Sequence, residues 1–350
     1  MRGLLHASER AAPPMLDRAP RVAFLGVGWI GRSRMHALID SGAALPIALA
    51  DADPPTRERV AGEVPGAHVR STLEELLALG PDGVVIATPS ALHADQAVQA
   101  LRAGAAVFCQ KPLGRTAAEV RRVLEAARCA DRLLAVDLSY RMTRAGQALR
   151  EVVESGRLGR VYAAELVFHN AYGPDKPWFT SRRQAGGGCL IDLGTHLIDL
   201  LLWLTTSNAI HVDAARILRH GVPLTDDGDE VEDFALAQVQ TDTGVAARVA
   251  CSWFLHAGCD CVFECALLGT EAAVRMTNVR GSFYDFEVAV HSGTAREVLV
   301  APPDDWGGRA IIAWGEGLAD GQRHGAAAVE ELERLAVALD EIYEAARCAR

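Results

Sequence analysis

Two polar side chains in the second half of the chain have the types and spacing needed to move a proton. Asp192 and His196 lie four residues apart in an apolar stretch that is predicted to be a helix, so they share one helical face. A carboxylate beside an imidazole orients the ring and favours its protonated form. Histidine titrates near neutral pH, so His196 could take a proton from an alcohol. An Asp/His pair with a purely structural role would have the same spacing, so the pattern alone does not decide between catalysis and structural support.

Lys111 is a third group that could do chemistry. It follows a buried apolar run, residues 105–109, and precedes Pro112. An ammonium there could hydrogen-bond a substrate hydroxyl and stabilise a developing alkoxide, although a solvated loop lysine has the same sequence signature. Gln110 beside it cannot ionise and can only orient or hydrogen-bond. The peptide bond before Pro112 can be cis, which the sequence does not decide.

Three glycines follow the apolar run 22–25 in the spacing G-x-G-x-x-G. Gly26 permits a tight turn, Gly28 lets the backbone approach a pyrophosphate, and Gly31 lets a helix pack closely on the strand. The helix expected at 32–39 begins with unpaired N–H groups and a partial positive charge, which suit a diphosphate. The motif alone is weak, because glycine-rich turns are common.

Asp51 strengthens the case for a dinucleotide site. It ends a second apolar run, 46–50, about 20 residues after Gly31, where a carboxylate can accept hydrogen bonds from the ribose hydroxyls. The same charge repels a 2′-phosphate, so we predict NAD rather than NADP. Arg32 and Arg57 leave NADP open, because either could approach a 2′-phosphate. The alternative is that Asp51 only begins a turn.

The elements that must position these groups alternate between strand and helix in the first half of the chain. This pattern predicts an α/β fold with a doubly wound parallel sheet. Ligands of such sheets bind beyond the carboxyl ends of the strands, where Gly26, Asp51, Thr88 and Lys111 fall. Further strands are expected at 83–87, 105–109 and 133–138, and helices at 93–103 and 116–128.

After Arg141 the pattern changes to a series of strands with few helices. We predict a large, mostly antiparallel sheet that is open on one face. Residues 326–346 are predicted to form an amphipathic helix with a stripe that packs on the protein, or alternatively on a partner helix. The expected helices are 145–154 and 189–204, and the expected strands are 161–169, 211–219, 234–241, 245–254, 261–268, 283–291 and 297–300. The stripe is Val329, Leu332, Leu335, Leu339 and Ile342.

Length and charge limit the classes of protein to consider. A chain of 350 residues suggests two domains, and we place them at 21–141 and 142–350 after a disordered tail, 1–20, in which Met15 could be the true start. The net charge of −10 and the lack of a basic block argue against nucleic acid as a partner. No apolar run approaches the roughly 18 residues of a membrane span, and no signal peptide is evident, so we expect a cytoplasmic protein.

The cysteines and the acidic residues are expected to be structural. The eight cysteines are most simply free thiols. Cys259, Cys261 and Cys265 resemble a metal cluster at first, but they alternate as one face of a strand and no fourth ligand is near. The acidic run 226–233 is predicted to be a solvated loop rather than a calcium site. We therefore predict no metal.

Three stretches together resemble the Gfo/Idh/MocA oxidoreductases, typified by glucose–fructose oxidoreductase and inositol dehydrogenase. They are VAFLGVGWIGRSRMHAL, IATPSALHADQAVQALRAGAAVFCQKPL and GGGCLIDLGTHLIDLLLWL. The resemblance covers nearly the whole chain from Arg21 onward. It implies an N-terminal Rossmann domain, a C-terminal α/β domain on a large open-faced sheet, and a homodimer or homotetramer formed through that sheet.

The resemblance also implies roles for particular residues. Lys111 matches the lysine of the family's Glu-Lys-Pro motif, between nicotinamide and substrate, and Asp192 and His196 match its catalytic Asp and His. Gln110 stands where Glu is usual, and Ser90 where Asn is frequent. The predicted cofactor-binding residues are Gly26, Gly28, Trp29, Ile30, Gly31, Asp51, Thr88, Pro89, His93, Gln110 and Lys111.

We therefore predict an NAD(P)-dependent oxidoreductase that acts on a carbinol or keto carbon of a sugar, cyclitol or related polyol. His196 would take the hydroxyl proton, Asp192 would orient His196, and Lys111 would hold the oxygen. The alternatives are a hydrolase that uses NAD for transient oxidation, and a regulatory protein that binds NAD without catalysis. The candidates for the substrate pocket are Tyr140, Arg141, Tyr172, Trp178 and Arg182, with His169 and Trp253 as further possibilities.

Overall fold

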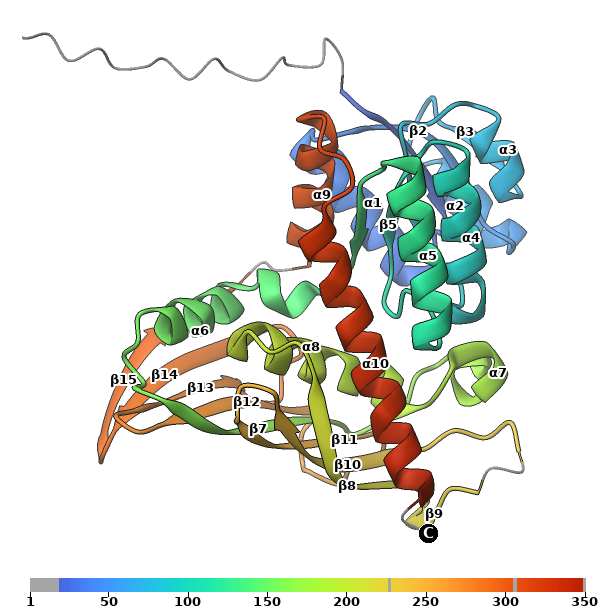
Figure 1. Ribbon diagram of the computed structural model, residues 1–350. Coiled ribbons are helices and arrows are strands. Elements are labelled where there is room, and N and C mark those ends of the chain that lie inside the picture. Colours follow the sequence, from blue (N-terminus) through green and yellow to red (C-terminus); the bar gives the residue numbers. More distant parts are fainter. Residues whose placement is uncertain (1–18, 226–227, 305–306, 349–350) are drawn as a thin grey trace, which may run out of the picture.

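The computed structural model describes residues 19–225, 228–304 and 307–348. These residues form two sheets that lie one above the other in Figure 1, with helices on both faces of the upper sheet and along one face of the lower. The expected tail, 1–20, lies outside the described residues except for Ala19 and Pro20.

The upper sheet has six parallel strands in the order β3-β2-β1-β4-β5-β6. This order confirms the predicted doubly wound sheet. The central strands are short apolar runs buried on both faces, as parallel sheets require. The strands are β1 Arg21–Leu25, β2 Leu45–Ala50, β3 His68–Arg70, β4 Gly83–Ile86, β5 Ala106–Cys109 and β6 Leu134–Val136.

Five helices alternate with these strands, and two of them were not predicted. Asp53 caps the second helix by accepting from the amide of Thr56, and Thr72 and Glu75 form a capping box on the third. Both signals stand in the sequence, so both helices could have been predicted. The helices are α1 Trp29–Ser41, α2 Pro54–Ala61, α3 Leu73–Leu77, α4 Ser90–Arg102 and α5 Ala117–Ala130.

The lower sheet has nine strands in the order β15-β14-β13-β12-β7-β11-β10-β8-β9. Its neighbours pair antiparallel except for β7 and β11, which are parallel, so the predicted mostly antiparallel sheet is confirmed. The strands β9 and β13 were not predicted. The strands are β7 Val161–Asn170, β8 Ile210–Arg219, β9 Val222–Pro223, β10 Phe234–Thr241, β11 Ala246–Ser252, β12 Cys261–Gly269, β13 Ala273–Asn278, β14 Phe286–Ser292 and β15 Ala295–Val300.

Helices cover one face of the lower sheet and enclose the larger core of the molecule. Alternate strand residues such as Leu166, Phe168 and Phe263 are buried there against Leu197 and Leu201. The opposite face carries no helix in the described part of the chain (Figure 1). The elements that link or cover the sheet are η1 Ser139–Met142, α6 Arg144–Glu154, η2 Pro177–Thr180, α7 Arg182–Ala185, η3 Leu190–Gly194 and α8 Thr195–Thr205.

The end of the chain joins the two domains. The unpredicted helix α9, Arg309–Ala319, packs on the upper sheet, where Trp314 lies 5.8 Å from Phe108 between ring centroids. Gly83 leaves room for that indole, because a Cβ there would approach it to 2.7 Å. The boundary at 141/142 therefore separates the sheets, but α9 returns to the first domain. The last helix, α10 Ala326–Cys348, contacts α5, α8 and β8.

The predicted stripe on the last helix packs inside the protein. Leu335, Leu339 and Ile342 are buried, and Leu332 is partly buried against the core. The stripe also reaches the first domain, because Val329 belongs to a core cluster beneath the parallel sheet. The prediction of internal packing rather than a partner helix is confirmed.

One helical segment has the length and composition of a membrane span, contrary to our expectation. An 18-residue window within the segment Arg182–Thr205 has a mean hydropathy of 1.4, and 89% of that window is buried inside the protein. Its apolar character is explained by its central place in the core that the lower sheet and its helices enclose.

Candidate active site

The glycine turn between β1 and α1 forms one end of a cleft at the carboxyl edge of the parallel sheet. Gly26 has a φ of +83°, and a Cβ there would lie 2.5 Å from the carbonyl oxygen of Ala87. A Cβ on Gly31 would clash with the carbonyl oxygen of Gly26, whereas a Cβ on Gly28 would meet nothing within 4 Å. Gly28 therefore keeps space open in the cleft itself, as close approach of a diphosphate requires.

Asp51 connects the glycine turn to the next loop. Its Oδ2 accepts from the amide of Val27 at 2.8 Å, and its Oδ1 accepts from the amide of Asp53 at 2.9 Å. Arg57 donates to the carbonyl oxygen of Asp51, and Arg32 donates to Glu63 at 2.7 Å. Both arginines therefore already have partners, and the carboxylate is the group that lines the cleft.

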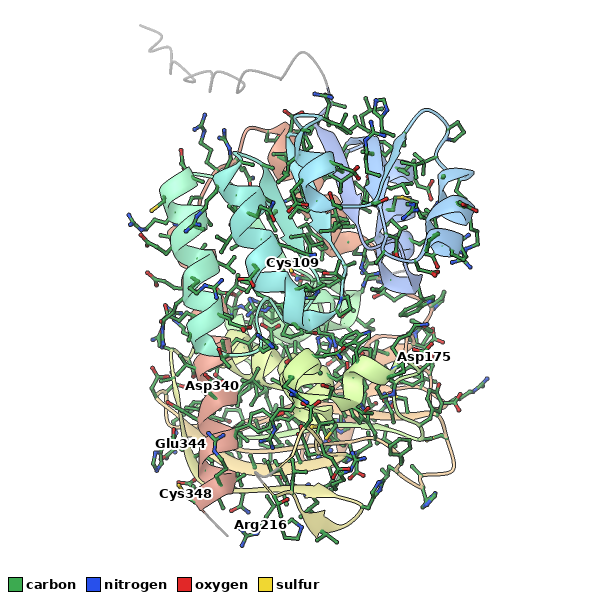
Figure 2. All side chains as sticks on the ribbon, turned by 90° about the vertical axis from the view of Figure 1, so that its right-hand side faces the viewer. Cys109, Asp175, Arg216, Asp340, Glu344 and Cys348 are labelled. Carbon is green, nitrogen blue, oxygen red and sulfur yellow. The ribbon has the colours of Figure 1, made fainter. Side chains whose placement is uncertain are left out.

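The cleft has a volume of about 660 Å³ and reaches from the glycine turn to the junction of the two domains. Asp175, which also lines it, lies at that junction in Figure 2. Gly31 alone among the predicted cofactor residues is not part of the wall, because it packs α1 onto the turn. The predicted residues that do line the cleft are Gly26, Gly28, Trp29, Ile30, Asp51, Thr88, Pro89, His93, Gln110 and Lys111.

His93 holds two segments of the cleft wall together. Its ring nitrogens lie 2.7 Å from the carbonyl oxygens of Thr88 and Pro112. Burial lowers the pKa of this imidazole, although the two carbonyl groups act in the opposite direction. The side chain therefore fixes the loop after β5, in which the peptide bond between Lys111 and Pro112 is cis.

Lys111 lies at the domain end of the cleft and is tied to Asp192. Its Nζ donates to both the Oδ1 and the backbone carbonyl of Asp192, at 2.7 Å each. Trp253 donates from its Nε1 to the other carboxylate oxygen at 3.1 Å. This Lys111–Asp192–Trp253 group brings together the two domains, and both Lys111 and Asp192 face the cleft.

The pairing of Asp192 differs from our expectation. We expected Asp192 to orient His196 through α-helical spacing, but residues 190–194 form one π-helical turn before α8 begins. Within the described residues, the side-chain hydrogen bonds of Asp192 go to Lys111 and Trp253. Turns of this kind are wider than an α-helix and are frequent at functional sites, so the four-residue rule does not apply here.

His196 is buried beside Tyr140, with ring centroids 4.7 Å apart. Its Nδ1 has no hydrogen-bond partner in the part of the chain that the structure describes. Burial holds the pKa of His196 well below its ordinary value, and the cations Lys111 and Arg34 act in the same direction. We expected a neighbouring carboxylate to favour the protonated ring; the structure instead favours the neutral one.

A buried polar network lies beside Lys111, and we did not predict it from the sequence. Asp137, which follows β6, accepts at Oδ2 from Arg34 Nε at 2.6 Å and from Gln110 Nε2 at 2.5 Å. Its Oδ1 accepts from Ser139 Oγ at 2.6 Å. Two signals were available: Asp137 is a polar residue at a strand end, and Arg34 lies on the buried stripe of α1 with Met35 and Leu38.

The glycine run before the π-helical turn is packed against protein rather than exposed. A Cβ on Gly187 would clash with the Tyr343 hydroxyl, and one on Gly188 would clash with the carbonyl of Glu232. The Glu232 carboxylate accepts from the amides of Gly188 and Leu190 and from the Tyr343 hydroxyl, at 2.7–3.0 Å. This network fixes the backbone that leads to Asp192.

The acidic run 226–233 is only partly the solvated loop that we expected. Glu232 and Asp233 are 1% and 7% exposed, and Asp229 accepts from Ser181 Oγ at 2.7 Å. Residues 226 and 227 lie outside the described part of the chain. The acidic run therefore holds the backbone at Gly188 and the start of α7.

The substrate candidates are divided between the cleft and the structural core. Trp178 lines the cleft, stacked on Phe179 at 3.8 Å between ring centroids. Tyr140 is buried among aromatic rings, and Arg141 pairs with Asp199 at 2.6 Å. These two residues pack the second domain rather than line the cleft.

The remaining candidates lie around the end of the lower sheet. Tyr172 is about half exposed and contacts the ring of Phe283. Arg182 begins α7 and lines a separate pocket beside α10. His169 lies 2.8 Å from Ser252 Oγ, and burial lowers its pKa.

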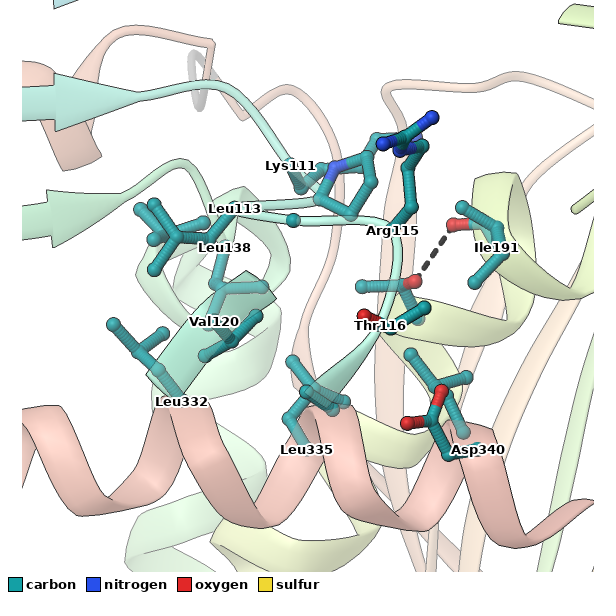
Figure 3. A pocket seen from close by; sticks show the side chains of 16 residues that line it. Lys111, Leu113, Arg115, Thr116, Val120, Leu138, Ile191, Leu332, Leu335 and Asp340 are labelled. Atoms are coloured by element: carbon teal, nitrogen blue, oxygen red, sulfur yellow. Dashed lines mark hydrogen bonds between the residues drawn. The ribbon is translucent and has the colours of Figure 1, made fainter. Parts of the chain in front are cut away.

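A small cavity of about 30 Å³ lies behind the Lys111 loop, between that loop and α10. Figure 3 shows Leu332, Leu335 and Asp340 of α10 below the loop, with Ile191 at one side. Asp340 accepts from the amide of Ala117 at 2.9 Å, at the start of α5. The last helix therefore supports the lysine from the side away from the cleft.

The cysteines are free thiols, as we predicted. Burial raises the pKa of Cys261 and of Cys265 to about 12, so both are protonated packing residues. No group of three or more metal-ligating side chains occurs among the described residues.

Comparisons with known proteins agree with this architecture. Residues 20–138 match the oxidoreductase family with an NAD-binding Rossmann fold, and residues 147–275 match the GFO/IDH/MocA C-terminal domain. The chain is 32% identical over 251 residues to a putative UDP-kanosamine synthase oxidoreductase subunit of Amycolatopsis mediterranei, covering 67% of this chain and 69% of that protein. It is 30% identical over 279 residues to an inositol 2-dehydrogenase of Rhizobium meliloti, covering 80% and 81%.

Solved structures share the fold over almost the whole chain. GenD2 from gentamicin A biosynthesis, in complex with NAD, has a TM-score of 0.80 at 25% identity, covering 99% of this chain and 98% of that one. Levoglucosan dehydrogenase with NADH and levoglucosan has a TM-score of 0.82 at 21% identity, covering 95% and 98%. The chain belongs to the Gfo/Idh/MocA family of oxidoreductases, and its first domain is the NAD-binding Rossmann domain of that family.

Proposed function

We propose that the enzyme transfers a hydride between NAD and a carbinol or keto carbon of a sugar, cyclitol or related polyol. The observation that carries this proposal is the Lys111–Asp192–Trp253 group, at the opposite end of the cleft from the glycine turn. An ammonium fixed by a carboxylate suits an oxygen that alternates between hydroxyl and carbonyl.

The residues of the cleft fit a dinucleotide. The amide groups at the start of α1 and the space above Gly28 would accommodate the diphosphate, and the Asp51 carboxylate would accept from ribose hydroxyls. We favour NAD over NADP because Asp51 would repel a 2′-phosphate. Arg32 is already paired with Glu63, which supports this preference.

We assign the role of general base to His196. Burial lowers the pKa of this imidazole, so the ring is neutral near pH 7 and has a lone pair that can accept a proton, although it is a weaker base than a solvated histidine. Bound NAD would supply the hydride acceptor in oxidation, and His196 would take the proton of the substrate hydroxyl. Lys111 would stabilise the oxygen, and we assign Asp192 to positioning Lys111.

The substrate class is supported by the cleft and by the relatives. Trp178 gives the cleft wall an aromatic surface suited to the apolar face of a sugar ring. The relatives include an inositol 2-dehydrogenase and a 1,5-anhydro-D-fructose reductase, and both names describe polyhydroxy substrates.

We also propose a cytoplasmic homodimer or homotetramer, formed through the open face of the lower sheet. By alternation with the buried strand residues, Ala250, Ala266 and Ala289 lie on this face, beside longer side chains such as Glu165 and Arg275. Light scattering after size-exclusion chromatography tests this proposal. A monomer at micromolar concentration would contradict it.

The test of function is a spectroscopic screen of purified protein with NAD or NADP and a panel of sugars, inositols and sugar acids, and of NADH with the corresponding ketones. We expect turnover with one substrate class, reduced about 10²-fold or more in Lys111→Ala and His196→Ala. The control is Gln147→Ala, which removes an exposed side chain outside the cleft. Undiminished turnover in both the Lys111 and the His196 variants would overturn the proposal.

A further inference from the structure

The network around Asp137 determines which atom Gln110 presents to the cleft. An ionised carboxylate can only accept hydrogen bonds, so the side of Gln110 that faces Asp137 at 2.5 Å must be its NH₂ group. The amide oxygen, Oε1, then points away from Asp137. Within the described residues, Oε1 makes no hydrogen bond and is not among the polar atoms buried without a partner.

We propose that Asp137 is a positioning residue that holds Gln110 with its amide oxygen facing the cofactor cleft, as a neutral acceptor for an N–H or O–H group of the bound cofactor. Gln110 lines the cleft next to Lys111, and Asp137 is 2% exposed behind it. This inference rests on the proposed NAD site.

The charge of the network explains why residue 110 is an amide. Arg34 and Asp137 form a buried pair of opposite charges, and Ser139 completes the hydrogen bonds of the carboxylate. A glutamate at 110 would place a second carboxylate against Asp137 with only one cation in contact. One of the two carboxylates would then hold a proton, because like charges in contact cannot both ionise easily.

The protonated form of a glutamate at 110 is the analogue of the native amide. Its O–H would donate to Asp137 and its carbonyl oxygen would face the cleft, as Gln110 Nε2 and Oε1 do. When that proton is lost at higher pH, two anions repel each other and the acceptor is no longer fixed. The groups that face the network are Arg34 from α1, Cys109 from β5, Lys111 from the following loop and His196 from α8.

The native network should not titrate near neutral pH. Burial raises the pKa of Cys109 and lowers that of His196, so the first stays a thiol and the second stays neutral. A new pH dependence in a variant can therefore be assigned to the introduced carboxyl group.

The experiment measures the dissociation constant of NADH by fluorescence between pH 6.5 and pH 9, for the full chain. In Gln110→Glu we expect NADH affinity to fall about tenfold as the pH rises, whereas the wild type stays flat. In the double variant Gln110→Glu/Asp137→Asn, the amide and the carboxylate exchange places, and we expect the new pH dependence to disappear. Gln147→Glu is the matched control for an added carboxylate at an exposed site.

Two results would overturn the inference: a Gln110→Glu variant with no new pH dependence, or a double variant with the same pH dependence as the single one. If Gln110→Glu does not fold, Gln110→Met replaces it, because it removes the acceptor without adding charge. Unchanged NADH affinity in that variant, with a native melting temperature, would also contradict the inference. Absence of NADH binding in the wild type would instead refute the proposed function.

Discussion

The two ends of the cleft are built in different ways. At the glycine-turn end, a short stretch of chain folds on itself, and Asp51 contacts Val27 only 24 residues away. At the Lys111 end, the contacts join residues far apart in sequence: Arg34 with Asp137 over 103 residues, and Lys111 with Asp192 over 81. The glycine-turn end is built from backbone groups and from glycines that lack a side chain. The Lys111 end is built from charged side chains that are buried or partly buried.

Because the two ends are built differently, we expect substitutions at each end to affect stability and cofactor binding in different ways. A backbone turn rejects a substitution through lack of space, as at Gly31, or through a positive φ, as at Gly26, and accepts one where space is free, as at Gly28. Cofactor binding and folding can therefore be altered independently. Buried charges are linked to one another and to folding, because removing one leaves its partner unpaired. The following predictions test this contrast.

The largest effect on stability is expected from the buried ion pair. Arg34→Met leaves the Asp137 carboxylate without its cation, and we expect a loss of about 3–5 kcal/mol in the free energy of unfolding. Arg32→Met on the same helix removes a partly exposed pair with Glu63 and should cost only about 0–1 kcal/mol. Urea denaturation of both variants measures the difference, and equal losses would argue against the contrast.

The glycine turn should separate folding from binding. Gly31→Ala forces a clash with the Gly26 carbonyl, and we expect a loss of about 1–3 kcal/mol in unfolding free energy. Gly28→Ala meets no protein atom, so we expect native stability but weaker NADH binding. Thermal melting and NADH titration of both variants test this. Tight NADH binding by Gly28→Ala would show that the diphosphate does not lie there.

The smallest effect is a pH dependence of stability that His196 contributes. Its folded pKa is lowered, so below its unfolded pKa of about 6.5 the unfolded state binds more protons and the free energy of unfolding falls as the pH falls. His196→Gln should lose less stability than the wild type between pH 7 and pH 5. His93 and His169 contribute in the same direction, so the slope should decrease without vanishing. An unchanged slope would contradict the buried neutral ring.

The sequence was most informative where structure depends on nearby residues. The glycine spacing, the buried strands and the terminal helix were predicted because each follows from local periodicity and turn chemistry. The helices α2 and α3 also had local signals, in Asp53 and in the Thr72–Glu75 pair. The helix α9 also had a local signal, because Ile311, Trp314 and Leu318 recur at helical spacing and share one packed face.

The pairing of polar groups could not be predicted from the sequence. Asp192 and His196 have α-helical spacing, but the π-helical turn and the approach of Lys111 gave Asp192 another partner. Asp137 was identifiable as a strand-end residue, but its partners on α1 and β5 depend on how the strands are ordered. Such contacts are decided by tertiary structure, as is the burial of Glu232.

We propose that Asp192 acts through Lys111 and not through His196. The direct test is a pair of double-mutant cycles on kcat/KM, with the substrate that the screen identifies. We expect Asp192→Asn and Lys111→Ala to be strongly non-additive, with a coupling of more than about 1 kcal/mol, and Asp192→Asn and His196→Ala to be nearly additive. Additivity with Lys111→Ala together with strong coupling to His196→Ala would show that Asp192 acts through His196, and would contradict this proposal.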